Sequence, residues 1–156
     1  MRQMRKQGTE EKRKPKMPEP IGDRITKVLK EKTPMPDTYG TMWYRQRELD
    51  FMFRDEFKRI GEKFVPVLVD LLATNGNAMV RRASAKMLGE ISANVPVGHS
   101  IHLQAEGPLL HASKHDPNPD VRHFACEAAS KVQVSKRLAE VLSGHGQVKG
   151  KSEGKS

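Results

Sequence analysis

The sequence predicts an all-α protein: a short α-solenoid of two to three helical hairpins, with an N-terminal capping helix and disordered basic tails. Three observations lead to this prediction. Apolar residues recur at steps of three and four through most of residues 23–143, which is the spacing of one helix face. A nine-residue pattern that starts with Val-Arg occurs twice, 41 residues apart, as in stacked hairpins. The excess of Lys and Arg over Asp and Glu lies at the two ends of the chain.

Charge and composition separate the ends of the chain from its centre. Residues 1–32 contain 11 Lys or Arg and five Asp or Glu, residues 33–135 contain 12 of each, and residues 136–156 contain five and two. Charged segments with few apolar side chains do not bury enough apolar area to fold. We therefore divide the chain into a disordered basic tail, N-terminal helices, helical repeats and a flexible basic tail, at residues 1–22, 23–63, 64–143 and 144–156.

Two helices are expected before the repeats. Asp23 can cap a short helix that continues to about Lys32, and the prolines that follow would end it. A longer helix is expected from Thr41 to Lys63. Its apolar face, with residue 64 just beyond it, carries Leu49, Phe53, Phe57, Ile60 and Phe64. An aromatic stripe at helical spacing is typical of a core, so we expect it to be buried; the alternative is an exposed surface on which a ligand stacks.

The first hairpin is expected between residues 64 and 91. An apolar helix begins near Phe64 and leads into a polar turn at residues 74–77. The second helix carries Val80 and Leu88 on one face. Two helices joined by about four residues pack antiparallel, so these segments should lie side by side.

The second hairpin is expected after an insertion at residues 94–103. Pro108 should open a short apolar helix, because proline is tolerated in a first helical turn. Residues 115–119 form the turn, and residues 121–132 form the following helix. Apolar residues within 134–143 predict one more, separate helix that would cap the C-terminal end.

The repeated pattern identifies a resemblance. The nine residues from Val80 and the nine from Val121 both read Val-Arg-x-x-small-small-charged-apolar-apolar. Together with Asp116-Pro-Asn-Pro-Asp120 before the second copy, this pattern resembles the HEAT-repeat family, and in particular its short phycobilisome-lyase-type repeats. The resemblance covers about residues 64–143, half of the chain. It implies an α-solenoid whose exposed helices bind another protein.

The resemblance also assigns structural roles within the repeat. The positions that carry it are Val80, Arg81, Leu88, Val121, Arg122 and Ala125. In such repeats the arginine helps to pack one unit against the next and often meets an aspartate from the turn between helices. It therefore implies that Arg122 pairs with Asp116 or Asp120, and that Arg81 has an equivalent structural role.

The cysteine and histidine residues do not predict a metal centre. Cys126 is the only cysteine, so the chain has no internal disulfide, and its place in an apolar helix predicts a buried thiol. His111 and His115 are four residues apart, and His99 and His102 are three apart. Two ligands are too few for a recognisable site, so we expect no metal and no other cofactor.

Catalytic motifs are not found in the sequence. It contains no glycine-rich phosphate loop and no Gly-x-Ser-x-Gly motif. The His-Glu pairs by which one family of HEAT-repeat enzymes holds iron do not occur either. Acidic pairs such as Asp55-Glu56 alternate with basic residues and suit a solvated helix face. We therefore expect a protein that is not an enzyme.

Two functions remain open from the sequence. The first is a non-catalytic protein-interaction scaffold or adaptor that binds a protein partner through the repeat surface. Its candidate partner-binding residues are Arg82, Lys86, His123 and Glu127. The second is a nucleic-acid-associated, ribonucleoprotein-type role through the basic tails. Its candidate polyanion-binding residues are Arg2, Arg5, Lys6, Lys12, Arg13, Lys14 and Lys16.

Location is predicted only coarsely. No apolar run approaches the roughly 20 residues of a membrane-spanning helix, and the N-terminus has no apolar secretory core. Acidic residues and prolines within residues 1–22 argue against a mitochondrial presequence. With a single cysteine, we expect an intracellular, cytoplasmic protein with no membrane contact.

Overall fold

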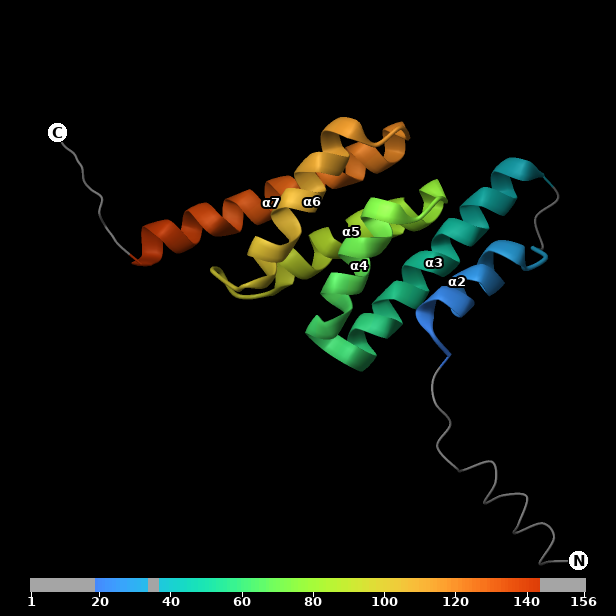
Figure 1. Ribbon diagram of the computed structural model, residues 1–156, viewed down its shortest axis with the longest axis horizontal. Coiled ribbons are helices and arrows are strands. Elements are labelled where there is room, and N and C mark those ends of the chain that lie inside the picture. The colour runs from blue at the N-terminus through green and yellow to red at the C-terminus, as the bar shows by residue number, and fades with distance from the viewer. Residues whose placement is uncertain (1–18, 34–36, 144–156) are drawn as a thin grey trace, which may run out of the picture.

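The computed structural model describes residues 19–33 and 37–143, and every regular element within them is a helix (Figure 1). In chain order these are α2 (Ile21–Lys30), α3 (Thr38–Ile60), the 3₁₀ helix η1 (Gly61–Lys63), α4 (Phe64–Thr74), α5 (Ala78–Asn94), α6 (Ile101–His115) and α7 (Pro119–Ser143). The described residues contain no strand, which confirms the all-α prediction. None of these helices combines the length and apolar character needed to cross a membrane.

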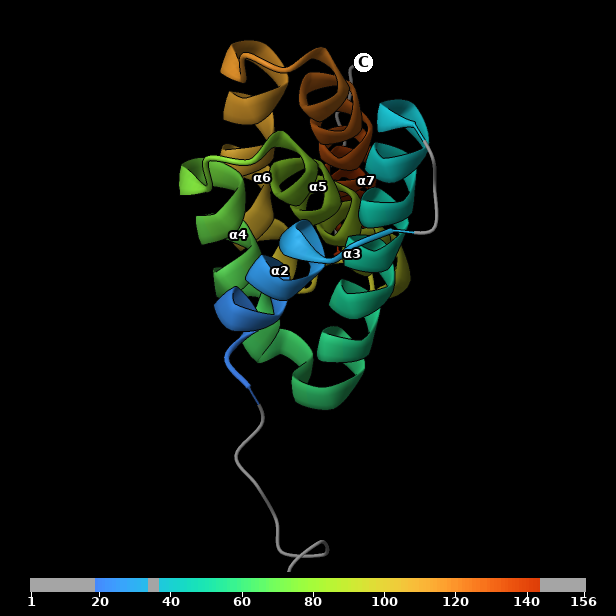
Figure 2. The same cartoon turned by 90° about the vertical axis from the view of Figure 1, so that its right-hand side faces the viewer.

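The helices pack as pairs in two layers. Helix α4 packs against α5, and α6 packs against α7. Helix α5 also contacts α7, α4 contacts α6, and α3 joins the layer of α5 and α7 by packing on α5. Viewed along the molecule, α4 and α6 lie on one side and α3, α5 and α7 on the other (Figure 2). Helix α2 covers part of α3.

One apolar core is shared by all the helices. Its largest fully buried apolar side chains are Phe53, Phe64, Leu49, Leu68, Leu88, Ile91, Ile101 and Leu109. The rings of Phe53 and Phe64 meet edge to face, with centroids 5.7 Å apart. The predicted aromatic stripe is therefore core at these two positions. Tyr39 and Trp43, nearer the start of α3, are exposed instead.

The turns of the two hairpins have the same hydrogen bonds. The side-chain oxygens of Asn75 and Asp116 each accept from the backbone N–H two residues later, at 2.9 Å in both turns. Asn77 caps α5 by accepting from the N–H of residue 79, and Asn118 accepts from the N–H groups at the start of α7. These residues are 41 apart in each case, so the sequence repeat is also a repeat of local structure.

Arg81 and Arg122 share part of their environment. Nη1 of Arg81 donates to the carbonyl oxygen of Asn75 at 2.9 Å, and Nη1 of Arg122 donates to that of Asp116 at 2.7 Å. The carboxylate of Asp116, however, is held by Arg81, whose Nε and Nη2 lie 2.8 and 3.1 Å from its two oxygens. The expected pairing of that carboxylate with Arg122 is wrong, because Arg81 reaches it from the preceding hairpin. Asp120 is exposed and makes no ion pair within the described residues.

The helix boundaries near the N-terminus differ from prediction. Helix α2 begins at Ile21 after Pro20, so Asp23 lies inside the first turn rather than at the cap. There its charge still complements the helix dipole. Helix α3 begins at Thr38 because the side chain of Asp37 accepts from the N–H of Gly40.

Helix α6 begins within the expected insertion, before the start that Pro108 predicted. It begins at Ile101 and contains Pro108 in its interior, seven residues further on. The buried residues Ile101, Ala105 and Leu109 form one stripe at steps of four. Burial of this stripe outweighs the hydrogen bond that proline removes, so the helix continues through Pro108. The irregular connection between α5 and α6 comprises residues 95–100, which is shorter than the insertion predicted at 94–103.

Helix α7 runs without interruption to Ser143, so the separate helix expected at 134–143 is wrong. Its buried residues are Val121, Ala125, Ala128, Ala129 and Val132. Cys126 lies off this face and is exposed, which corrects the prediction of a buried thiol. The apolar residues of the second half, Val134, Leu138, Val141 and Leu142, are also exposed.

Candidate partner-binding groove

The first half of α3 carries large side chains that are exposed. Tyr39, Met42, Trp43, Gln46 and Arg47 recur at steps of three, one, three and one, which places them on one side of the helix. Tyr39 is 80% exposed, and Met42 and Trp43 are each about half exposed, at 50% and 49%. Three large exposed apolar side chains in five residues form a patch that water solvates poorly.

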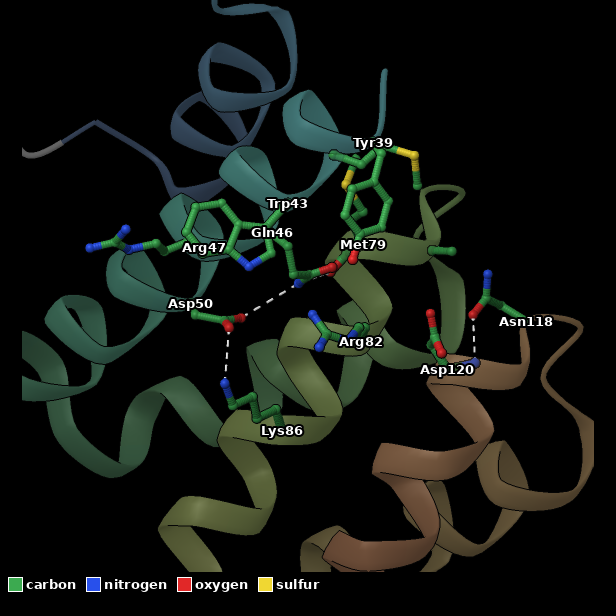
Figure 3. Close-up of a pocket in the computed structure, with 12 residues that line it drawn as sticks. Tyr39, Trp43, Gln46, Arg47, Asp50, Met79, Arg82, Lys86, Asn118 and Asp120 are labelled. Atoms are coloured by element: carbon green, nitrogen blue, oxygen red, sulfur yellow. Dashed lines mark hydrogen bonds and ion pairs between the residues drawn. The ribbon is translucent and has the colours of Figure 1, made fainter. Parts of the chain in front are cut away.

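This patch forms one side of a groove (Figure 3). The groove encloses about 430 Å³ and is lined by three helices. Helix α3 supplies Tyr39, Met42, Trp43, Gln46, Arg47 and Asp50; α5 supplies Ala78, Met79, Arg82 and Lys86; Asn118 and Asp120 stand at the start of α7. Figure 3 shows Arg82 pointing from α5 into the space between α3 and α7.

Polar contacts join α3 and α5, the two helices that supply most of the groove lining. Gln46 donates from Nε2 to the carbonyl oxygen of Met79 at 3.0 Å. Lys86 Nζ lies 3.0 Å from a carboxylate oxygen of Asp50. These contacts fix α3 against α5, so the groove is formed before any partner binds.

Further along the same helix pair, Arg54 forms a two-pronged ion pair with Glu90. Nε and Nη2 of Arg54 each lie 3.1 Å from a carboxylate oxygen of Glu90. The hydrogen bond to Glu90 raises the pKa of Arg54, so the guanidinium stays charged. This pair adds a second fixed point between α3 and α5 beyond the groove.

Two arginines at the groove lie over aromatic rings. The guanidinium carbon of Arg82 is 4.4 Å from the ring centroid of Phe124 in α7. That of Arg47 is 5.4 Å from the Trp43 ring and 5.6 Å from the Phe51 ring. Among residues 19–33 and 37–143, neither arginine makes an ion pair with a carboxylate. Stacking leaves the edge of a guanidinium open, so both can bind an incoming anion.

The groove is suited to recognition. It offers an apolar patch, two arginines open to a carboxylate, and fixed polar groups at Asn118 and Asp120. Most ligand sites combine an apolar surface with a few placed polar groups in this way. Asp50 and Asp120 keep the charge of the lining near balance, which disfavours a strongly anionic ligand and suits a mixed protein segment.

The predicted partner-binding residues fall at two places. Arg82 and Lys86 line the groove. His123 and Glu127 lie beside it on α7, where their side chains pair at 3.3 Å and are both exposed. The ring of His123 contacts Phe124, the same ring that Arg82 covers. The predicted polyanion-binding residues between 2 and 16 lie outside the described residues.

The sequence favoured a core role for the aromatic residues of α3 and kept an exposed stacking surface as the alternative. It did not separate Trp43, at the groove, from Phe53, in the core. Met42 lies seven residues before Leu49 and eleven before Phe53, so helical spacing continues the core stripe to it and does not reveal its exposure. What the spacing alone did not reveal was that α5 and α7 leave this face open.

The histidines at 99, 102, 111 and 115 lie at different places in the fold and have different partners. His99 bonds Glu62 at 2.9 Å, and His102 is buried with Nε2 2.9 Å from the carbonyl oxygen of Ser92. The rings of His111 and His115 lie with centroids 4.8 Å apart at the end of α6. In the described part of the chain, no three His, Cys, Asp or Glu residues gather as metal ligands would.

Comparisons of this chain with protein-family models, with curated protein sequences and with solved structures find no match. The resemblance to HEAT repeats therefore stays a prediction. The function has to be argued from the groove and from the packing of the helices.

Proposed function

We propose that this protein is a non-catalytic interaction scaffold that binds a segment of a partner protein in the groove between α3, α5 and the start of α7. The observation that carries the proposal is the exposed patch of Tyr39, Met42 and Trp43 beside Arg82. Aromatic and arginine side chains dominate the energy of protein interfaces, because they combine a large apolar area with a polar edge. Here both kinds stand around one preformed hollow.

The packing of the helices supports the architecture within this proposal. Pairs α4–α5 and α6–α7 have matching turns, and α5 contacts α7 while α4 contacts α6. These contacts support a short HEAT-like α-solenoid, in which successive hairpins share a core. In such a stack α3, α5 and α7 form a row, and a partner can contact several helices at once. We expect α3 to act as the N-terminal cap of that row.

A matched pair of exposed aromatic residues tests the function. Trp43 and Phe51 lie on the same helix and are about equally exposed, at 49% and 48%, but only Trp43 lines the groove. Wild type, Trp43→Ala and Phe51→Ala would be used to capture partners from the native source, with identification by mass spectrometry. We expect one partner to be lost with Trp43→Ala and retained with Phe51→Ala.

An Arg82→Glu variant extends this test, because it reverses the charge that faces the groove without removing a buried group. We expect the same partner to be lost, since an interface with its arginine replaced loses about 2 kcal/mol or more. Retention of every partner by both Trp43→Ala and Arg82→Glu would reject the groove as the binding site.

A nucleic-acid-associated function is the second candidate, and the charge of the chain favours it. Residues 1–32 contain 11 Lys or Arg against five Asp or Glu, and none of them is among the residues that line the groove. Its test is an RNA titration at two salt concentrations, with the full chain and with residues 1–18 removed. We expect affinity that falls as salt rises and falls again on truncation. Affinity unaffected by both would reject this function.

A further inference from the structure

Helix α7 stands at the end of the row formed by α3, α5 and α7 (Figure 1). The face by which α5 binds α7 carries small buried residues, among them Ala85, Gly89 and Ser92. Gly89 lies so close to α7 that a Cβ added to it would be 2.9 Å from the Cβ of Ala128. The contact between the two hairpins therefore depends on small side chains along α5.

The outer face of α7 repeats this arrangement. Forty-one residues after Ala85, Gly89 and Ser92 stand Cys126, Ser130 and Gln133. Two of these are also small, but Cys126 and Ser130 are exposed and Gln133 is only half buried. Within the described residues, nothing covers α7 in the way that α7 covers α5. Val134 and Leu138 continue the run of exposed positions at steps of four.

Arg122 repeats the polar part of the same contact. Its Nη1 donates to a carbonyl oxygen six residues earlier, as Nη1 of Arg81 does. In Arg81 the other two nitrogens, Nε and Nη2, hold the carboxylate of Asp116 in the next hairpin. In Arg122 the same two nitrogens have no acceptor within residues 19–33 and 37–143. The guanidinium is thus held in the position that binds a carboxylate, with that carboxylate not provided by the described chain.

We infer that the outer face of α7 binds a helical hairpin of a partner protein, in the way that α5 binds the hairpin of α6 and α7. This surface is separate from the groove. The partner hairpin carries an aspartate in its turn, which Arg122 holds. The second helix of the partner hairpin carries a small residue about three helical turns after that aspartate, as Ala128 follows Asp116 here. This small residue lets the partner helix approach Cys126 and Ser130 closely.

A second copy of this chain does not offer that hairpin. Its own Asp116 is already held by Arg81, and releasing it would unpair a buried ion pair. The turn of its first hairpin has Asn75 at the equivalent place, which lacks the charge. The chemistry of the turn therefore indicates a different protein with the same kind of hairpin.

The experiment supplies such a hairpin from the chain itself. The full chain is extended after Ser156 with a second copy of residues 95–143, and residues 144–156 serve as the tether. In the added copy Cys126→Ser removes the thiol, so the original Cys126 is the only cysteine. The measurement is the rate of thiol modification by a maleimide reagent. We expect docking to slow modification by about tenfold or more relative to the unextended chain.

Three variants of the extended chain show whether the docking is the one inferred. Arg122→Ala in the original copy, or Asp116→Asn in the added copy, should restore the fast rate. Asparagine keeps the turn hydrogen bond, as Asn75 shows, and removes only the charge. Lys114→Ala in the added copy changes an exposed residue of α6 and should leave the protection intact.

Two results would overturn the inference. One is an unchanged modification rate in the extended chain, whether or not circular dichroism shows that the added hairpin gained helix. The other is a concentration-dependent dimer of the unextended chain, seen by light scattering, in which Cys126 is already protected. That second result would assign the face to a second copy of this protein.

Discussion

Arg81 and Arg122 occupy one repeat position and differ in a single neighbour. Both donate to a carbonyl oxygen six residues earlier, but only Arg81 also holds a carboxylate. The side chains of Arg81 and Asp116 are 12% and 6% exposed, so the pair is largely removed from water. Identical residues therefore contribute differently to stability, because the low dielectric around one of them strengthens an ion pair that the other lacks.

This difference predicts unequal losses of stability for two equivalent substitutions. Arg81→Met leaves the Asp116 carboxylate buried without its partner and should lower the free energy of unfolding by roughly 2–4 kcal/mol. Arg122→Met removes a hydrogen bond to a carbonyl oxygen and should cost about 1 kcal/mol. Urea denaturation of both variants measures the two losses. Equal losses would show that the Arg81–Asp116 pair does not join the hairpins.

Two glycines on helices make a second matched pair. A Cβ at Gly89 would lie 2.9 Å from that of Ala128, whereas a Cβ at Gly22 meets nothing within 4 Å. Gly89→Ala should therefore force α5 and α7 apart and cost about 1–3 kcal/mol. Gly22→Ala should be neutral or stabilising by up to about 1 kcal/mol, because alanine favours helix. Thermal unfolding checks both, and an unaffected Gly89→Ala variant would contradict the close approach of the helices.

For single residues, the sequence predicted burial correctly where burial depends only on the residue's own hairpin. Val80 and Val121 were predicted to hold matching repeat positions, and both are fully buried. Cys126 was expected to be buried and is exposed. Its equivalent, Ala85, is buried because a further hairpin lies against it. The repeat pattern describes which face can be covered and does not say whether the next hairpin exists.

Among the elements, α6 departs most from what its sequence predicted. Proline usually marks the first turn of a helix, so Pro108 was placed at the start. The helix begins seven residues earlier because Ile101, Ala105 and Leu109 form one buried stripe. Helix type and hairpin order could be predicted from periodicity, but this boundary depended on which residues the neighbouring helices bury.

The first turn of α6 can be tested directly. Ile101 is fully buried, and Leu103, two residues later, is 73% exposed. Ile101→Ala should cost about 2–4 kcal/mol, because it leaves a cavity in the shared core. Leu103→Ala should change stability by less than about 0.5 kcal/mol. If residues 101–107 were an irregular insertion outside the core, chemical denaturation would instead find both variants near wild type.

Helix α3 presents two faces with opposite roles. Phe53 is fully buried against Phe64, while Phe51 on the same helix is half exposed. Phe53→Ala should lower the free energy of unfolding by about 3–5 kcal/mol, and Phe51→Ala by less than about 1 kcal/mol. The two values from urea denaturation would establish which face supports the fold. A large loss for Phe51→Ala would mean that this half-exposed ring also supports the fold.

Across the whole molecule, the groove and the outer face of α7 arise from the same geometry. Pairing of α4 with α5 and α6 with α7 sets α3, α5 and α7 in a row. One side of that row is hollowed at the groove, and its end is open at α7. The groove could not be predicted from one segment, because its lining comes from three segments about 40 positions apart. The outer face of α7 lies on one helix, but its exposure depends on whether another hairpin packs against it. Periodicity predicts which face of a helix is apolar, but it does not predict which other helices pack against that face.

The central claim is that the two hairpins form one cooperative body through the contact of α5 with α7. Native-state hydrogen exchange of the full chain at increasing urea tests it most directly. Leu88 in α5 and Ala129 in α7 hold equivalent buried places, and their amides should open with free energies that agree within about 1 kcal/mol and fall together. Opening of Ala129 at a free energy several kcal/mol lower, with Leu88 still protected, would show that the hairpins do not share one core.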